Sequence, residues 1–257
     1  MDGENIPVAP TNDRLLNSFE RIVHRRYSCK HFDTQRTICP RLLRRILLAT
    51  LRAPSGFNLQ PWVAVMVSME SQRERLYEAA LRQKQVLDAP VTVVFACSTD
   101  FSHTNNELRR TEKRGMEAGG VERFYFQRNT RFMLNQGPCG IFQKAKCLGI
   151  QLYRKHAQAP MLSIPHDMRG YGWKQCMIPA TFFMLAATSA GLQTACLEGI
   201  DEGLVKKVVG LTPQHSVPCI ISIGYEKKPP KVFPTVRRNP KDVFFDGTFG
   251  ESTSILT

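Results

Sequence analysis

One stretch of the chain has residues suited to binding a ligand: Ala53-Pro54-Ser55-Gly56-Phe57-Asn58-Leu59-Gln60-Pro61-Trp62. Within it, Pro54 would end a preceding helix, because its ring clashes with the preceding turn and it has no N–H. Gly56 permits backbone conformations that other residues avoid, while Asn58 and Gln60 supply amide donors and acceptors. From these residues alone, the stretch is either an ordinary connection from a helix to a strand or a binding loop.

Two cationic segments near opposite ends of the chain could bind an anion. The first is Arg26-x-Ser28-x-Lys30. If it is extended, its three side chains point to one side, because side chains alternate along an extended chain. A guanidinium, a hydroxyl and an ammonium on one side form a good anion site. The second segment is Arg237-Arg238-Asn239-Pro240. Each segment, taken alone, is also typical of a solvated charge cluster.

Several common catalytic motifs are absent from the sequence. Its glycines form no Gly-x-Gly-x-x-Gly fingerprint, Walker P-loop or Gly-x-Ser-x-Gly elbow, so a Rossmann dehydrogenase or a hydrolase has no support. The six histidines have no ligand spacing, and we expect no metal site. The eight cysteines include no Cys-x-x-Cys and several lie in apolar runs, so we expect reduced thiols.

Charge and composition narrow the class of protein further. The 257 residues include 35 basic and 22 acidic side chains, and the net charge of +13 favours anionic ligands. The basic residues are scattered rather than gathered in a stripe, so we expect no nucleic-acid partner. The uncharged stretch from Gln175 to Leu197 contains too many polar residues for a membrane span, and we expect it in the core. Without a secretory or transit signal, a cytoplasmic location is expected.

Hydrophobic periodicity predicts helices and buried strands that alternate along the chain. The predicted helices are Arg14 to Arg26, Pro40 to the Pro54 loop, Ser71 to Leu81, Ile178 to Ala190 and Glu202 to Val209. The predicted strands are Trp62 to Val67, Val91 to Ala96, Gln193 to Leu197 and Val217 to Tyr225. One face of the first helix is apolar, with Leu15, Leu16, Phe19, Ile22 and Val23. The order of elements predicts an α+β or α/β fold around one sheet.

Residues from about 101 to 175 differ in character from the rest of the chain. They are polar and rich in glycine and proline, which predicts an irregular, partly helical insertion in a single domain spanning residues 1–257. Its aromatic triad Phe124-Tyr125-Phe126 either belongs to the core or lines a pocket.

Five elements, in order along the chain, resemble those of the nitroreductase family. They are Arg26-Tyr27-Ser28-x-Lys30-x-Phe32, the loop from Ala53 to Trp62, Val86-Leu87-Asp88-Ala89-Pro90, the segment Ala190-Gly191-Leu192-x-Thr194-x-x-Leu197-Glu198-Gly199, and a strand ending Ile223-Gly224-Tyr225 before a proline-rich basic tail with Arg238. The resemblance implies an α+β fold with a central mixed, mostly antiparallel sheet flanked by helices. It further implies a homodimer with swapped C-terminal tails and FMN at the subunit interface.

The resemblance also assigns roles to individual residues. Arg26 and Ser28 would hold the FMN phosphate together with Arg238 or Arg237. Lys30 would lie near the flavin N1/O2 edge, where positive charge stabilises the reduced, anionic flavin. The loop of the other subunit would contact the flavin through Pro54, Ser55, Gly56, Asn58 and Gln60. Glu198 and Gly199 would face the isoalloxazine, with a backbone N–H near N5. Further implied cofactor contacts are Tyr27, Arg82, Gln85 and Leu197.

The sequence departs from the family pattern at two of these positions. Many members have Asn near the position of Arg82 and Lys near that of Gln85, so the contacts of these two residues with the flavin are in doubt.

Three functional hypotheses follow, in order of preference. The first is an FMN-dependent oxidoreductase in which NADH or NADPH reduces the flavin, and a nitroaromatic, quinone or related acceptor is then reduced in the same pocket. The second keeps the fold but changes the flavin chemistry to reductive dehalogenation or desaturation. The third is a non-catalytic basic protein that binds an anionic surface or a nucleic acid.

Overall fold

The computed structural model describes residues 12–99, 132–137, 140–157, 160–161, 163–227 and 235–256. The chain divides into two compact units, Met1–Lys227 and Lys228–Thr257, and each is described by itself. The aromatic triad at 124–126 and most of the predicted insertion lie outside the described residues.

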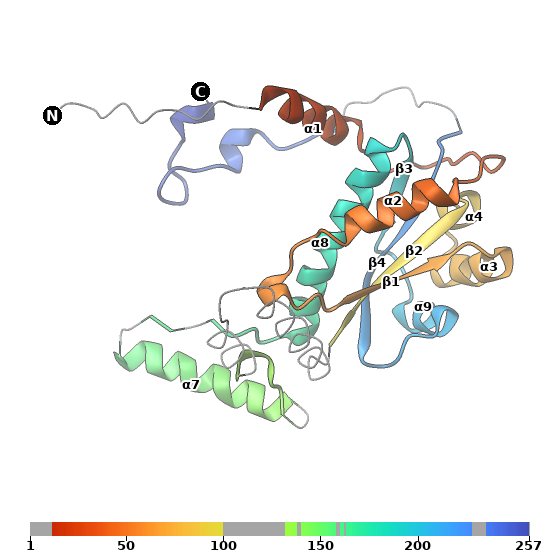
Figure 1. Ribbon diagram of the computed structural model, residues 1–257. Coiled ribbons are helices and arrows are strands. Elements are labelled where there is room, and N and C mark those ends of the chain that lie inside the picture. The colour runs from red at the N-terminus through yellow and green to blue at the C-terminus, as the bar shows by residue number, and fades with distance from the viewer. Residues whose placement is uncertain are drawn as a thin grey trace, which may run out of the picture. The chain divides into compact units, whose positions relative to one another are not determined.

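The first unit is built on a four-stranded antiparallel sheet in the order β1-β2-β4-β3 (Figure 1). Its strands are β1 (Trp62–Val67), β2 (Val91–Ser98), β3 (Gln193–Leu197) and β4 (His215–Gly224). Its helices are α1 (Asp13–Arg25), α2 (Pro40–Thr50), the 3-10 turn η1 (Gly56–Asn58), α3 (Glu70–Ala79), α4 (Gln85–Asp88), α7 (Ile141–Ala157), α8 (Met168–Ser189) and α9 (Glu202–Val209). The predicted α+β class is confirmed.

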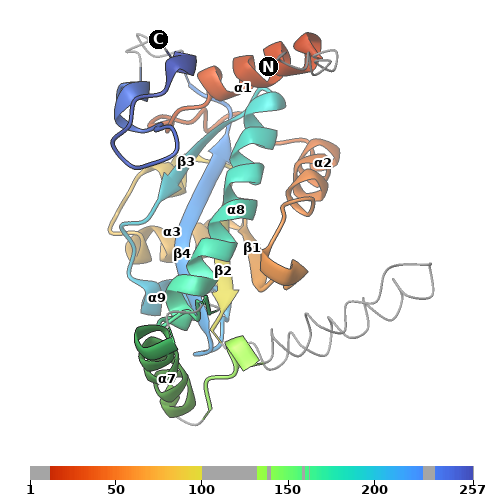
Figure 2. The same ribbon diagram turned by 90° about the vertical axis from the view of Figure 1, so that its left-hand side faces the viewer.

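Helices cover both faces of the sheet, so the central strands have no solvated side. On one face α8 crosses the strands and packs against α2, as Figure 2 shows. That face is held by a buried cluster that includes Ile46, Phe95 and Phe183. Seven of the eight residues of β2 are buried, as the continuous apolar run predicted.

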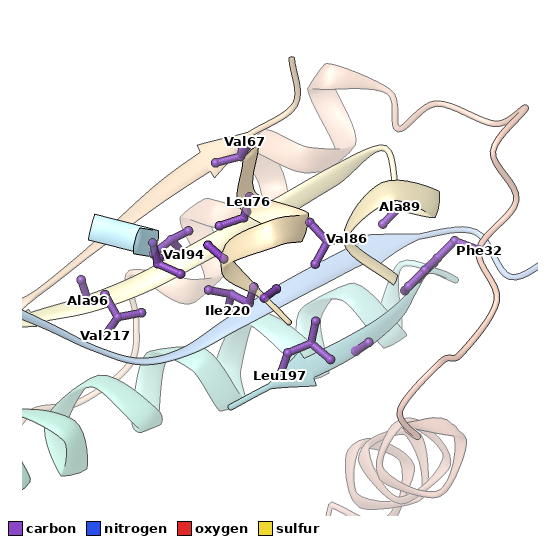
Figure 3. Packing of buried hydrophobic residues seen from close by; sticks show 14 of the residues in the cluster. Phe32, Val67, Leu76, Val86, Ala89, Val94, Ala96, Leu197, Val217 and Ile220 are labelled. Atoms are coloured by element: carbon purple, nitrogen blue, oxygen red, sulfur yellow. The ribbon is translucent and has the colours of Figure 1, made fainter. Parts of the chain in front are cut away.

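The opposite face of the sheet packs against α3, α4 and α9. Figure 3 shows its buried side chains, among them Leu76 from α3, Val86 from α4 and Leu197 from β3. Side chains of β3 point alternately to the two faces, and that of Leu197 points into this core. Leu197 is the last residue of β3, and the chain leaves the sheet after it. This position at the end of an edge strand becomes important for the candidate site.

The prediction that the long core helix begins at Ile178 was wrong, because α8 begins at Met168. Asp167 caps its N-terminus, since its side chain accepts hydrogen bonds from the backbone N–H groups of Arg169 and Gly170 at 2.9 Å each. Gly172 lies within the predicted irregular insertion, where Gly170-Tyr171-Gly172 suggests a turn, but it serves close packing in α8 instead. A Cβ at that position would lie 2.8 Å from the Cys97 Sγ. The short helix α4 was also not predicted.

Helix α1 has the predicted amphipathic pattern but buries none of its residues in the described chain. The exposed fraction of Leu15 is 66% and that of Phe19 is 51%. At the edge of the sheet, β1 likewise exposes Val63 and Met66. Helix α1 contacts α8 but keeps most of its apolar side chains exposed, and β1 exposes one apolar side chain on each face of the sheet.

The second unit contains two 3-10 turns, η3 (Pro240–Asp242) and η4 (Ser254–Leu256). Phe245 pairs with Ser252 by a single antiparallel bridge, and its ring lies 4.9 Å from that of Phe249. Within the described parts of both units, no helix is long and apolar enough to cross a membrane. The seven cysteines that the structure describes are all free thiols, as expected.

Candidate functional site

The segment from Arg26 to Lys30 runs along the outer edge of β3. Ser28 forms a parallel bridge with Thr194, and the N–H of Cys29 donates to the Thr194 carbonyl at 2.9 Å. The side chain of Cys29 is fully buried, whereas those of Ser28 and Lys30 are exposed. Tyr27 and Cys29 pack on the core, so the alternation of an extended chain puts Arg26 and Ser28 on the other side, and the exposed Lys30 follows at a bend.

These three side chains are available to a ligand. None of them makes a hydrogen bond or an ion pair with another residue that the structure describes. A guanidinium, a hydroxyl and an ammonium along the edge of one strand suit the phosphate of a nucleotide.

Tyr27, which the resemblance also assigned to the cofactor, is engaged elsewhere. Its hydroxyl donates to the Glu226 carboxylate, and its ring packs on the core beside β3. Burial raises the pKa of the Tyr27 hydroxyl, and the Glu226 carboxylate raises it further. Tyr27 therefore stays a neutral donor and anchors the segment from the side opposite to Arg26.

The chain leaves β3 through an exposed turn at Glu198 and Gly199. The Ile200 N–H donates to the Glu198 carbonyl at 2.9 Å, and the Asp201 N–H donates to the Ala79 carbonyl at 2.7 Å. We find no acceptor among the described residues for the N–H groups of Glu198 and Gly199. The turn thus offers backbone donors at the end of β3, and the cationic segment runs along the edge of the same strand.

A second turn, between α3 and α4, contacts this one. Both Leu81 and Arg82 have positive φ angles, 53° and 60°, which non-glycine residues rarely adopt. Arg82 pairs with Glu78 at 3.0 Å, with both side chains exposed, and Gln85 is the first residue of α4. The contact with the Glu198–Gly199 turn is made instead by Gln83, whose Nε2 donates to the Gly199 carbonyl at 2.8 Å.

The loop from Pro54 to Gln60 is braced by its own side chains. The Ser55 Oγ accepts from the Gln60 N–H at 2.9 Å, and the Gln60 Nε2 donates to the Asn58 Oδ1 at 3.1 Å. The unusual backbone angles lie at Asn58 and Gln60, with φ of 53° and 45°. The prediction that Gly56 supplies the unusual conformation was therefore wrong.

Glycine at position 56 lets α8 lie close against the loop. A Cβ there would lie 3.0 Å from the Tyr171 hydroxyl oxygen and 3.2 Å from the Gln175 Nε2. The Gly56 N–H donates to the Gln175 Oε1 at 2.6 Å, and only 4% of the Gln175 surface is exposed. The early start of α8 thus provides a rigid support for the loop.

Gln175→Met tests the hydrogen bond between Gln175 and Gly56, because methionine keeps the length of the side chain but removes the Oε1 acceptor. The Gly56 N–H would be left half-buried without a partner, so we expect a loss of about 1–3 kcal/mol in unfolding free energy. Urea denaturation measures it. Gln151→Met, on the exposed side of α7, is the matched control and should change the unfolding free energy by less than about 0.5 kcal/mol. Equal stability of the two variants would contradict the proposed support.

One chain does not bring all the predicted residues together. The cationic segment and the Glu198–Gly199 turn lie at the β3 edge, whereas the loop precedes β1 at the other edge. Three strand spacings separate β1 from β3, or about 14 Å. Figure 1 shows α2 leading to this loop beside the start of α8, away from β3.

Arg237 and Arg238 belong to the second unit. In that unit, the Arg237 Nη1 donates to the Val236 carbonyl at 2.9 Å, and the Arg238 Nη2 donates to the Asp242 carbonyl at 2.6 Å. Both residues are exposed. The assignment of either arginine to a phosphate stays a prediction.

Two buried or half-buried amides, Gln83 and Gln175, were missed by sequence reasoning. Each bonds to the backbone of a residue that the sequence did single out, Gly199 and Gly56. A glutamine next to a predicted contact, as Gln83 is next to Arg82, was the available signal. Gln175 had no such signal, because it lies where the predicted irregular insertion ends and the predicted core stretch begins.

Known proteins resemble this chain over most of its length. The model of the nitroreductase family matches residues 23–225. An NADH dehydrogenase of Thermus thermophilus is 25% identical over 189 residues, which are 72% of this chain and 75% of that protein. An oxygen-insensitive NAD(P)H nitroreductase of Salmonella typhimurium is 24% identical over 208 residues, 78% of this chain and 85% of that protein.

A solved structure agrees with the sequence comparisons. The NADPH:FMN oxidoreductase of Vibrio harveyi, complexed with NAD+, has a TM-score of 0.60 at 18% identity, covering 93% of this chain and 81% of that one. At this identity the likeness concerns the fold alone. The family match, however, includes the cationic segment, the loop before β1 and the turn after β3. This chain belongs to the nitroreductase family.

Proposed function

We propose that this protein is an FMN-dependent oxidoreductase that uses NADH or NADPH to reduce nitroaromatics, quinones or related acceptors by a ping-pong mechanism. The observation that carries the proposal is the set of Arg26, Ser28 and Lys30 side chains along the edge of β3, which are exposed or half-buried and make no hydrogen bond or ion pair with the described residues. Bound FMN would supply the hydride-transfer chemistry, and the protein would bind it and tune its reactivity.

The residues at the β3 edge fit a flavin mononucleotide. Arg26 and Ser28 would hold the phosphate by charge-assisted hydrogen bonds, and Lys30 would add positive charge beside the ring. The unused N–H groups of Glu198 and Gly199 offer donors to a polar ring edge at the end of the same strand. No side-chain nucleophile is required for this chemistry.

The binding loop would come from a second copy of the chain. Its Ser55, Asn58 and Gln60 lie at the opposite edge of the sheet from Arg26, so one chain does not bring the loop and the cationic segment to one site. The exposed apolar face of α1 and the open edge of β1 are surfaces that a homodimer would cover. We assign the loop to the partner's FMN, and Arg237 or Arg238 to a tail that crosses to the partner.

The proposed function is tested by purification, reconstitution with FMN and assay of NADH and NADPH oxidation. We expect a yellow protein that oxidises at least one of the two donors when a nitroaromatic or a quinone is present. Omitting the acceptor under anaerobic conditions should limit oxidation to one equivalent per flavin, as a ping-pong mechanism requires. A colourless protein that neither binds FMN nor oxidises either donor would contradict the proposal.

A further inference from the structure

Gln83 joins two turns that are far apart in sequence. Its side-chain Nε2 donates to the Gly199 carbonyl at 2.8 Å and to the Ala80 carbonyl at 3.1 Å. Gly199 has no side chain, and a Cβ there would lie 3.6 Å from this Nε2. Gln83 is half-buried and its bond to the Ala80 carbonyl is partly buried, whereas its bond to Gly199 lies at the exposed surface.

The bond to Gly199 fixes the orientation of the turn after β3. A peptide group is planar, so a carbonyl held at Gly199 also fixes the N–H of Ile200. That N–H donates to the Glu198 carbonyl, and the next N–H, of Asp201, donates to the Ala79 carbonyl. The Gly199 carbonyl is held by the side chain of Gln83, whereas the other two hydrogen bonds join backbone groups. The turn is held through the Gly199 carbonyl, and the N–H groups of Glu198 and Gly199 have no acceptor among the residues that the structure describes.

The backbone before Gln83 is strained, which indicates that its position matters. Leu81 and Arg82 both adopt positive φ angles, and each costs about 1–3 kcal/mol. This reversal ends α3 and aims Gln83 toward the end of β3. A role limited to capping α3 through Ala80 would not require the shorter bond to Gly199.

We propose that Gln83 is a positioning residue, which holds the Glu198–Gly199 turn so that its free N–H groups meet the flavin ring. The inference rests on the proposed FMN function and deepens it. Gln83 would act through the Gly199 carbonyl and need not touch the cofactor itself. Its amide donor, rather than its bulk, is the feature that matters.

Gln83→Met and Gln83→Glu test the donor. Met keeps the length of the side chain without a donor, and Glu can donate only when its carboxyl is protonated. Gln72→Met, the same change on α3 at a residue whose side chain makes no hydrogen bond with the described residues, is the control. The readouts are the FMN dissociation constant, the visible circular dichroism of bound FMN, and the single-turnover rate of FMN reduction by the better of NADH and NADPH.

For Gln83→Met we expect a dissociation constant about two- to tenfold higher, a changed dichroism spectrum and a reduction rate about three- to tenfold lower at saturating FMN. The rate of Gln83→Glu relative to wild type should rise as the pH falls from 8 toward 5, because the neutral acid regains a donor. Gln72→Met should match wild type in all three readouts.

The outcomes separate this inference from the function on which it rests. If the wild type binds no FMN, the proposed function fails and the inference fails with it. If the wild type binds and reduces FMN but Gln83→Met has the same spectrum and reduction rate, Gln83 has no positioning role. A lower melting temperature with unchanged flavin readouts would likewise leave Gln83 a structural residue and overturn the inference.

Discussion

Replacing Arg26 by alanine should weaken FMN binding by about 10- to 150-fold, because a phosphate would lose a charge-assisted partner worth about 1.5–3 kcal/mol. The Arg26 side chain makes no hydrogen bond or ion pair with the described residues, so its removal leaves no protein group unsatisfied. The melting temperature of the FMN-free variant should therefore stay close to that of the FMN-free wild type. Fluorescence titration with FMN measures the effect.

Arg25→Ala is the matched control for this experiment. It removes the same charge one residue earlier, on the exposed last turn of α1, and should change FMN affinity by less than about twofold. Arg238→Ala should weaken FMN retention in the same way as Arg26→Ala if the tail reaches the phosphate. Equal FMN affinity of Arg26→Ala and wild type would contradict the assignment of the FMN phosphate to the β3 edge.

The second large effect is expected from Phe19→Glu on the exposed apolar face of α1. If a second copy covers this face, two carboxylates enter an apolar interface, one from each subunit. At about 2 kcal/mol or more for each, the dimer dissociation constant should rise at least about a thousandfold. FMN should be lost together with the dimer, because the loop would come from the partner. Sedimentation velocity and flavin absorbance follow the two losses.

Asn17→Glu introduces the same residue on the polar face of α1 and is the control for Phe19→Glu. It should remain dimeric and retain FMN. A Phe19→Glu variant that is monomeric yet binds FMN with wild-type affinity would show that one chain suffices for the site.

Local patterns predicted the elements that surround the candidate site. The apolar run after Pro61 placed β1 correctly, and the alternation at Arg26-x-Ser28 gave the side on which these two side chains lie. These predictions succeeded because an extended chain alternates its side chains with a period of two, whatever its tertiary partners.

Contacts between distant segments could not be predicted in the same way. The start of α8 at Met168 depends on the Asp167 cap and on packing of Gly172 against Cys97, and the Gly170-Tyr171-Gly172 sequence suggested a turn. The hydrogen bond of Gln175 to Gly56 follows from that start. Gln83 lies next to the predicted contact Arg82, but no local pattern reveals which backbone group its amide reaches, because Gly199 is 116 residues away.

The central claim is that the FMN site combines the β3 edge of one subunit with the loop of the other. Co-expression of Arg26→Ala and Ser55→Tyr chains, with different tags, tests it most directly. Ser55 has an extended backbone that tyrosine can adopt, and the ring would block the loop surface. Neither homodimer should bind FMN well. The purified heterodimer unites an intact Arg26 with an intact loop at one site, so about half of the wild-type FMN occupancy should return. A heterodimer as empty as both homodimers would contradict the account.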